Sequence, residues 1–169
     1  MVTLGLDAST TCVGYAFTED KKILDMGFID IKKEKTPKDK VEKVLDFLHN
    51  SSYIDNVTNI NIEDNLSGFA GGRTSQQVII KLAKFNAILC FMLENFDFTV
   101  HNINPMTARK NVFGKARVKG LKAEDFVKRQ VDGLYDTKKW CKTTARGNWD
   151  KRNIDAYDGL VMSLFEEKA

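Results

Sequence analysis

Four acidic residues have the chain positions and neighbours that a metal-dependent active site requires. Asp7 ends an N-terminal run in which apolar and polar residues alternate, and small residues surround it. Glu63 ends a second such run, and Asp155 and Asp158 are three residues apart, a spacing that puts both carboxylates on one face of a helix. Carboxylate oxygens without histidine suit Mg²⁺ or Mn²⁺. The four residues together therefore predict an oxygen-only site for a hard divalent cation.

Each of these carboxylates also has an ordinary structural interpretation. Asp7 can cap the turn that follows its strand, and the helix dipole tolerates Asp155 and Asp158 near a helix N-terminus. Asp64 competes with its neighbour Glu63, which is favoured only if the isoleucines of that strand point into the opposite layer. A bound cation would offset the repulsion among all four, and this favours the functional interpretation of the set.

The elements around these residues predict an α/β fold with a mixed sheet. Three antiparallel strands come first and two further strands follow, at 2–7, 12–18, 23–31, 57–63 and 98–103. Helical spacing predicts helices at 38–49, 78–93, 107–112, 122–134 and 153–167. The stretch 135–152 is basic, aromatic and weakly periodic, so we expect a loop there.

The helix predicted at 78–93 is too apolar to bury only one stripe, since 13 of its 16 residues are apolar. A membrane span is disfavoured because the run is shorter than about 18 residues and is interrupted by Lys81, Lys84 and Asn86. A helix that packs on its own sheet with one side and on a second subunit with the other explains the pattern better. We therefore expect a homodimer and no membrane.

Composition limits the class of protein. At 169 residues, 43% of them apolar, the chain is expected to form one domain over 1–169. No export signal begins the sequence, so a cytoplasmic location is expected. Cys12, Cys90 and Cys141 have no zinc-site spacing and are expected to be reduced thiols. The two histidines are far apart in the chain, which argues against a histidine-based zinc centre or a serine-type triad.

Positive charge is concentrated in one region of a chain whose net charge is only +3. Residues 101–152 contain 14 Lys or Arg and 5 Asp or Glu, whereas the rest of the chain contains 12 and 18. A solvated lysine-rich surface is the plain explanation. Aromatic residues are interleaved with this charge, at Phe113, Phe126, Tyr135, Trp140 and Trp149. Basic and aromatic residues together favour nucleic-acid binding.

At this point the chain resembles a known family, the RuvC-type Holliday junction resolvases of the RNase H-like superfamily, particularly versions encoded by bacteriophages. The resemblance rests on the order and spacing of three short segments, Leu4-Gly5-Leu6-Asp7-Ala8-Ser9, Ile60-Asn61-Ile62-Glu63 and Ile154-Asp155-Ala156-Tyr157-Asp158-Gly159-Leu160. It extends over nearly the whole chain in element order. It implies an RNase H-like fold with a five-stranded mixed sheet flanked by helices.

The resemblance also implies roles for individual residues. Asp7, Glu63, Asp155 and Asp158 would be catalytic and hold two Mg²⁺ ions, with Mn²⁺ as a substitute. The family's basic residue near the cut phosphate matches Lys119, with Lys115 and Arg117 of the same linker as alternatives for that role and as DNA-binding candidates.

The loop after the glutamate strand carries two more DNA-binding candidates. Phe69, flanked by glycines, matches the family's aromatic side chain that stacks on or wedges between bases at the branch, and Arg73 lies in the same loop. A hydrophobic anchor for the loop is the alternative role of Phe69. By the same resemblance, a homodimer would cut opposing strands of a four-way junction, in the bacterial host cytoplasm if a phage encodes the chain.

Three other functions have to be weighed against junction resolution. The chain could be an RNase H-like nuclease with broader substrates, such as other branched DNA or RNA-DNA hybrids. Its segment 6–11 also resembles the phosphate motif of actin-like ATPases and sugar kinases, although that fold needs two lobes. A non-catalytic junction-binding protein is the third alternative, which the repulsive cluster of four carboxylates disfavours.

Overall fold

The computed structural model describes residues 1–64 and 75–167. Its strands are β1 (Val2–Ala8), β2 (Cys12–Glu19), β3 (Lys22–Asp30), β4 (Val57–Glu63) and β5 (Thr99–Ile103). Its helices are α1 (Pro37–His49), α2 (Gln76–Asn95), α3 (Pro105–Phe113), α4 (Ala123–Leu134) and α5 (Asn153–Leu164), with a short 3-10 helix η1 (Ile54–Asn56) before β4.

The strands form one mixed sheet in the order β3-β2-β1-β4-β5. The first three strands are an antiparallel meander, whereas β4 runs parallel to β1 and β5 runs parallel to β4. The predicted α/β fold with three antiparallel strands and two further strands is therefore confirmed. Because β1 and β4 are parallel neighbours, their carboxyl ends lie side by side at one edge of the sheet.

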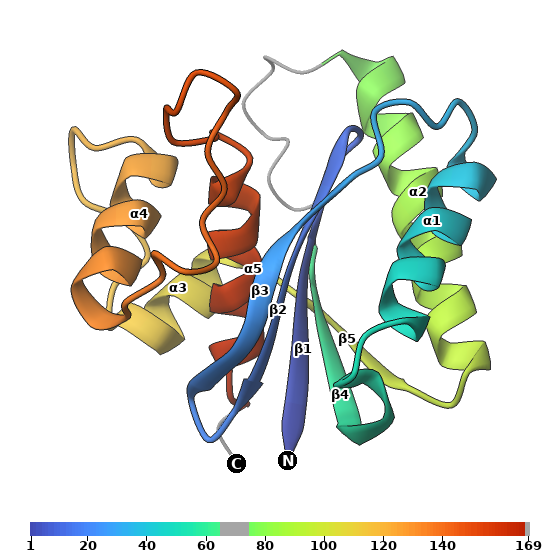
Figure 1. Cartoon of the computed structure of the whole chain (residues 1–169), viewed down its shortest axis with the longest axis horizontal. Helices are drawn as coiled ribbons and strands as arrows, with labels where there is room; N and C mark the ends of the chain where they lie inside the picture. Colours follow the sequence, from blue (N-terminus) through green and yellow to red (C-terminus); the bar gives the residue numbers. More distant parts are fainter. Residues whose placement is uncertain (65–74, 168–169) are drawn as a thin grey trace.

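Helices cover both faces of the sheet (Figure 1). Helices α1 and α2 pack on one face and bury Val41, Val44, Phe85 and Leu89 against it. Helix α5 packs on the other face, across β1 and β2, with α3 and α4 outside it. Two hydrophobic cores result, one on each side of the sheet.

The alternation of β1 and β4 sorts their side chains between these two cores. Leu6 and Ile62 are register partners and lie fully buried in the core beneath α1 and α2. Asn61 points the other way, because its side-chain amide donates to the carbonyl oxygen of Met162 in α5, at 2.9 Å. Glu63 is in phase with Asn61 and therefore faces α5, as the strand pattern predicted.

Two glycines allow the backbone of α5 to approach the sheet closely. A Cβ atom added at Gly5 would overlap the carbonyl oxygen of Gly159, and one added at Gly14 would overlap the carbonyl oxygen of Asp155. No residue with a side chain could occupy either position without pushing the helix away. The two glycines thus set the distance between the strand carboxylates and the helix carboxylates.

Helix α2 is longer than the sequence pattern predicted. It spans 20 residues with a mean hydropathy of 1.4, so by length and composition alone it could cross a membrane. Our argument that the run is too short was therefore wrong. One side of α2 packs on the sheet, since Leu82 and Leu93 are buried there and Asn86 donates to the carbonyl oxygen of Glu63 at 3.4 Å. Only 28% of its apolar window is buried.

Candidate active site

The four predicted acidic residues come together where β1 and β4 end and α5 begins. Asp7 is the penultimate residue of β1, and Glu63 is the last residue of β4. Asp155 lies in the first turn of α5 and Asp158 one turn further on, both toward the sheet edge at which the strand carboxylates project. The fold thus assembles residues from the start, the middle and the end of the chain.

Burial and mutual repulsion disfavour the ionised forms of these carboxylates. Asp7 is only 9% exposed and Asp158 only 8%. Burial, and then the charges of Glu63, Asp158 and Asp155, raise the pKa of Asp7 well above its ordinary value. The pKa of Asp155 is raised by burial as well, and by the charge of Asp158. The native structure therefore disfavours ionisation of all these groups at once.

Glu63 shows the same effect and leaves an unpaired atom. Burial, followed by the charge of Asp158, raises the pKa of Glu63 to about 7. Its Oε2 atom is buried and has no hydrogen-bond partner among the described residues. A buried carboxylate oxygen without a donor is costly unless a cation satisfies it.

Arg109 in α3 is the main positive charge at the site, and sequence reasoning missed it. Its Nη2 atom donates to Oδ1 of Asp158 at 2.9 Å, and both side chains are 11% exposed. Its charge lowers the pKa of Asp158, Glu63 and Asp7 against the effect of burial. One sequence feature could have pointed to Arg109. The Asn104-Pro105 pair starts a helix directly after β5 and so brings the first turns of α3 to the end of the sheet where Glu63 lies.

Cys12 is a second neighbour that the sequence did not point to. It is buried at the start of β2, and its thiol hydrogen-bonds to the carboxylate of Asp155. This bond lowers the pKa of Asp155, although burial outweighs it. Cys12 is therefore a positioning contact for Asp155, in addition to being the reduced thiol that its spacing predicted.

The donor set fits a hard divalent cation in chemistry. All four side chains offer oxygen, and Glu63 Oε2 has no other partner within the described ranges. Among residues 1–64 and 75–167, however, no three His, Cys, Asp or Glu side chains are grouped closely enough to enclose an ion. Arg109 supplies the compensating charge in this arrangement through its ion pair with Asp158.

The predicted basic residues lie outside this cluster. Lys115, Arg117 and Lys119 are exposed in the linker between α3 and α4, and none forms an ion pair or hydrogen bond within the part of the chain that the structure describes. Phe69 and Arg73 lie outside the described residues. Asp64, the competitor of Glu63, donates its backbone N–H to the carbonyl oxygen of Ile103 at 2.8 Å, next to β5.

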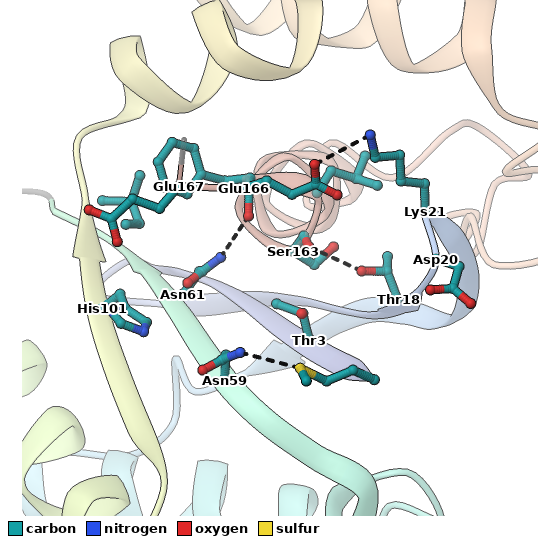
Figure 2. A pocket seen from close by; sticks show the side chains of 14 residues that line it. Thr3, Thr18, Asp20, Lys21, Asn59, Asn61, His101, Ser163, Glu166 and Glu167 are labelled. Carbon is teal, nitrogen blue, oxygen red and sulfur yellow. Dashed lines mark hydrogen bonds and ion pairs between the residues drawn. The ribbon is translucent and has the colours of Figure 1, made fainter. Parts of the chain in front are cut away.

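A polar cavity of about 440 Å³ lies at the opposite end of α5 (Figure 2). Asn61 donates to the carbonyl oxygen of Phe165 there at 3.3 Å, and Thr18 donates to that of Ser163 at 3.1 Å. Lys21 pairs with Glu166 at 3.5 Å. None of the four carboxylates lines this cavity. These hydrogen bonds join the last turn of α5 to the sheet, and so they fix the helix at the end away from the four carboxylates.

Comparison with solved structures identifies the architecture. The structure of Thermus thermophilus RuvC matches with a TM-score of 0.64 at 13% identity, over 97% of this chain and 92% of that chain. The chain has the RuvC fold. The Thermus thermophilus RuvC structure in complex with Holliday junction substrate gives the same TM-score, 0.64, at 13% identity, over 97% of this chain and 90% of that chain.

A eukaryotic structure shares the RuvC fold with this chain. The yeast mitochondrial Holliday junction resolvase Ydc2 matches with a TM-score of 0.62 at 15% identity, over 95% of this chain and 75% of that chain. No protein-family model matches the sequence, and neither does any curated protein. At such identities the likeness establishes the fold, and the expected RNase H-like architecture is confirmed.

Proposed function

We propose that this chain is a metal-dependent endonuclease that cuts four-way and other branched DNA. One observation carries the proposal: on a RuvC fold, Asp7, Glu63, Asp155 and Asp158 meet at one end of the sheet, with Asp7 and Asp158 buried and Glu63 and Asp155 half-buried, and the charges of their neighbours raise the pKa values of Asp7, Glu63 and Asp155. A protein that only bound junctions would gain nothing from such a cluster, because it costs stability at neutral pH.

The residues of the site would have different roles in holding the metal ions. Asp7 and Glu63 would hold cations from the sheet, and Asp155 and Asp158 would hold them from α5. When bound, two Mg²⁺ ions, or Mn²⁺ in their place, supply activation of water and stabilisation of the leaving oxygen in phosphodiester hydrolysis. Arg109 keeps Asp158 oriented and favours its ionised form, which a metal ligand requires.

The basic region 101–152 would hold the DNA. Lys119 remains our proposal for the basic residue near the cut phosphate, because the linker between α3 and α4 is exposed and lies at the end of the molecule where β1 ends (Figure 1). Phe69 and Arg73 remain proposed DNA contacts beyond the described residues. Since phosphate contacts dominate such binding, affinity should fall steeply with salt.

A homodimer is part of the proposal, because two cuts in opposing strands need two sites. Helix α2 supplies a surface for it. Ile80, Ile88 and Phe91 are 53%, 37% and 62% exposed and follow one another along one face of the helix. A second copy of this chain, packed on the same face, would cover this apolar stripe symmetrically. A cytoplasmic location and a bacteriophage source remain predictions.

One cleavage assay tests the proposal against its alternatives. Purified protein is incubated with labelled four-way junction, three-way junction, linear duplex and RNA-DNA hybrid, with Mg²⁺ or with EDTA. We expect Mg²⁺-dependent, paired nicks in the four-way junction and far slower cutting of the linear duplex. Equal cutting of the hybrid would favour a broader RNase H-like nuclease. Binding to the junction without any cutting would favour a non-catalytic protein.

A further inference from the structure

The predicted loop 135–152 contains a folded hairpin, residues 142–150, and we call this hairpin together with Lys151 the basic prong. Thr143 and Trp149 form an antiparallel bridge, and the N–H of Thr144 donates to the carbonyl oxygen of Asn148 at 2.7 Å. The turn closes through Gly147, whose N–H donates to Thr144 at 2.8 Å and whose φ of 77° favours glycine. Sequence periodicity could not show this, since the paired strands are only about two residues long.

The base of the prong is fastened to the helix that carries two of the carboxylates. The side chain of Asn153 is 1% exposed and holds both main-chain groups of Lys142, accepting from its N–H at 2.9 Å and donating to its carbonyl oxygen at 2.8 Å. The ring of Trp149 packs edge-on against Tyr157, with centroids 6.0 Å apart. Asn153 and Tyr157 flank Asp155, so the prong has a set position relative to the active site.

The outer surface of the prong carries positive charge that the described chain does not neutralise. Arg146, at the tip, and Lys151, just after the base, are exposed and have no ion pair or hydrogen bond from their charged groups within 1–64 and 75–167. The nearest acid along the chain, Asp150, is already engaged by Arg152 at 2.6 Å. Cations held beside a nuclease site and left without an anion attract a polyanionic substrate.

We infer that the basic prong is a DNA-binding element that grips the phosphate backbone of a duplex arm next to the cut strand, with Arg146 and Lys151 as its contacts. This inference rests on the proposed function, because it places DNA at the carboxylate cluster. Figure 1 shows the prong at the same end of the molecule as the start of α5. Backbone contacts carry no base preference, so the prong adds affinity rather than sequence selectivity.

The test measures binding of a labelled four-way junction in Ca²⁺ across a salt series, in an Asp7→Asn background. Arg146→Gln and Lys151→Gln, each alone, should weaken binding about fivefold to tenfold at 0.1 M salt and reduce the salt slope by roughly 0.9. Lys22→Gln is the matched control, since this exposed lysine lies at the β2–β3 turn, at the opposite end of β1. It should change neither quantity.

The outcomes separate this inference from the proposed function. If both prong variants bind like the control, with unchanged thermal unfolding, the prong is not a DNA contact, even if the wild-type protein cuts junctions. If both lose affinity while the wild-type protein cuts nothing in Mg²⁺, the prong stands and the nuclease proposal fails. Arg146→Lys should restore most of the affinity lost in Arg146→Gln, which a merely structural role of the guanidinium would not predict.

Discussion

Neutralising Glu63 should stabilise the metal-free protein at neutral pH, although it removes a proposed metal ligand. Burial and the charge of Asp158 raise the pKa of Glu63 from 4.5 to about 7. The native protein therefore holds a proton that the unfolded chain releases between these values. Since the native state binds more protons in this window, the free energy of unfolding falls as pH rises through it.

The size of the effect follows from the two pKa values. At about 1.4 kcal/mol for each pH unit between them, full ionisation of Glu63 costs the native state about 3 kcal/mol. Glu63→Gln should recover most of that amount at pH 8 and almost none at pH 4. Mg²⁺ should reverse the order, because the wild-type protein gains stability from a bound cation and the variant gains much less.

Urea unfolding in EDTA at pH 4 and pH 8, followed by fluorescence, measures both differences. Taking the variant relative to the wild type at each pH cancels the groups that do not interact with Glu63. Asp7, whose pKa the charge of Glu63 raises, adds to the gain at pH 8 in the same direction. Asp64→Asn is the matched comparison: the charge of Asp64 is the smallest of the causes that act on the pKa of Glu63, so this variant should show a much smaller pH-dependent gain. An equal effect of Glu63→Gln at the two pH values would refute the reasoning. A gain in Asp64→Asn larger than that in Glu63→Gln would reassign the ligand.

Three further predictions concern the surroundings of the site. Gly14→Ala should lower the free energy of unfolding by about 1–3 kcal/mol and slow nicking, because the added methyl overlaps the backbone of Asp155. Gly133→Ala, in open space on α4, is the control: in urea unfolding it should be neutral or gain about 0.4–1 kcal/mol. Arg109→Gln should lower the free energy of unfolding by about 3–5 kcal/mol at pH 8, and by less at pH 4, where the unpaired Asp158 can take up a proton. Equal unfolding curves of variant and wild type would contradict the role of the ion pair. Phe91→Glu should convert a dimer to a folded monomer in light scattering, and an unchanged mass would exclude α2 as the interface.

Local patterns were enough to predict the residues whose environment repeats along the chain. The alternation in β1 and β4 has a period of two, so it predicted both strands and the direction in which Asp7 and Glu63 point. Helical spacing likewise placed Asp155 and Asp158 on one face of α5. Neighbouring residues determine these features, so they can be predicted without knowledge of the rest of the fold.

Features that depend on distant contacts could not be predicted in this way. Arg109 is one of 14 basic residues in its region, and only the position of α3 beside α5 singles it out. The basic prong exists because Asn153 holds its base from another element. Nothing in the strand pattern distinguishes Gly14 from its neighbours. Only the packing of α5 against it shows that a side chain at this position would overlap the helix backbone.

The most direct test of the account is a comparison of wild type and Asp7→Asn on one labelled four-way junction, with cutting measured in Mg²⁺ and binding in Ca²⁺. Asp7 is buried, and the charges of the other three carboxylates act on it. We predict that the variant binds the junction nearly as tightly as the wild type and cuts at least about 10³-fold more slowly. Cutting by Asp7→Asn at a rate near that of the wild type would contradict the assignment of the active site.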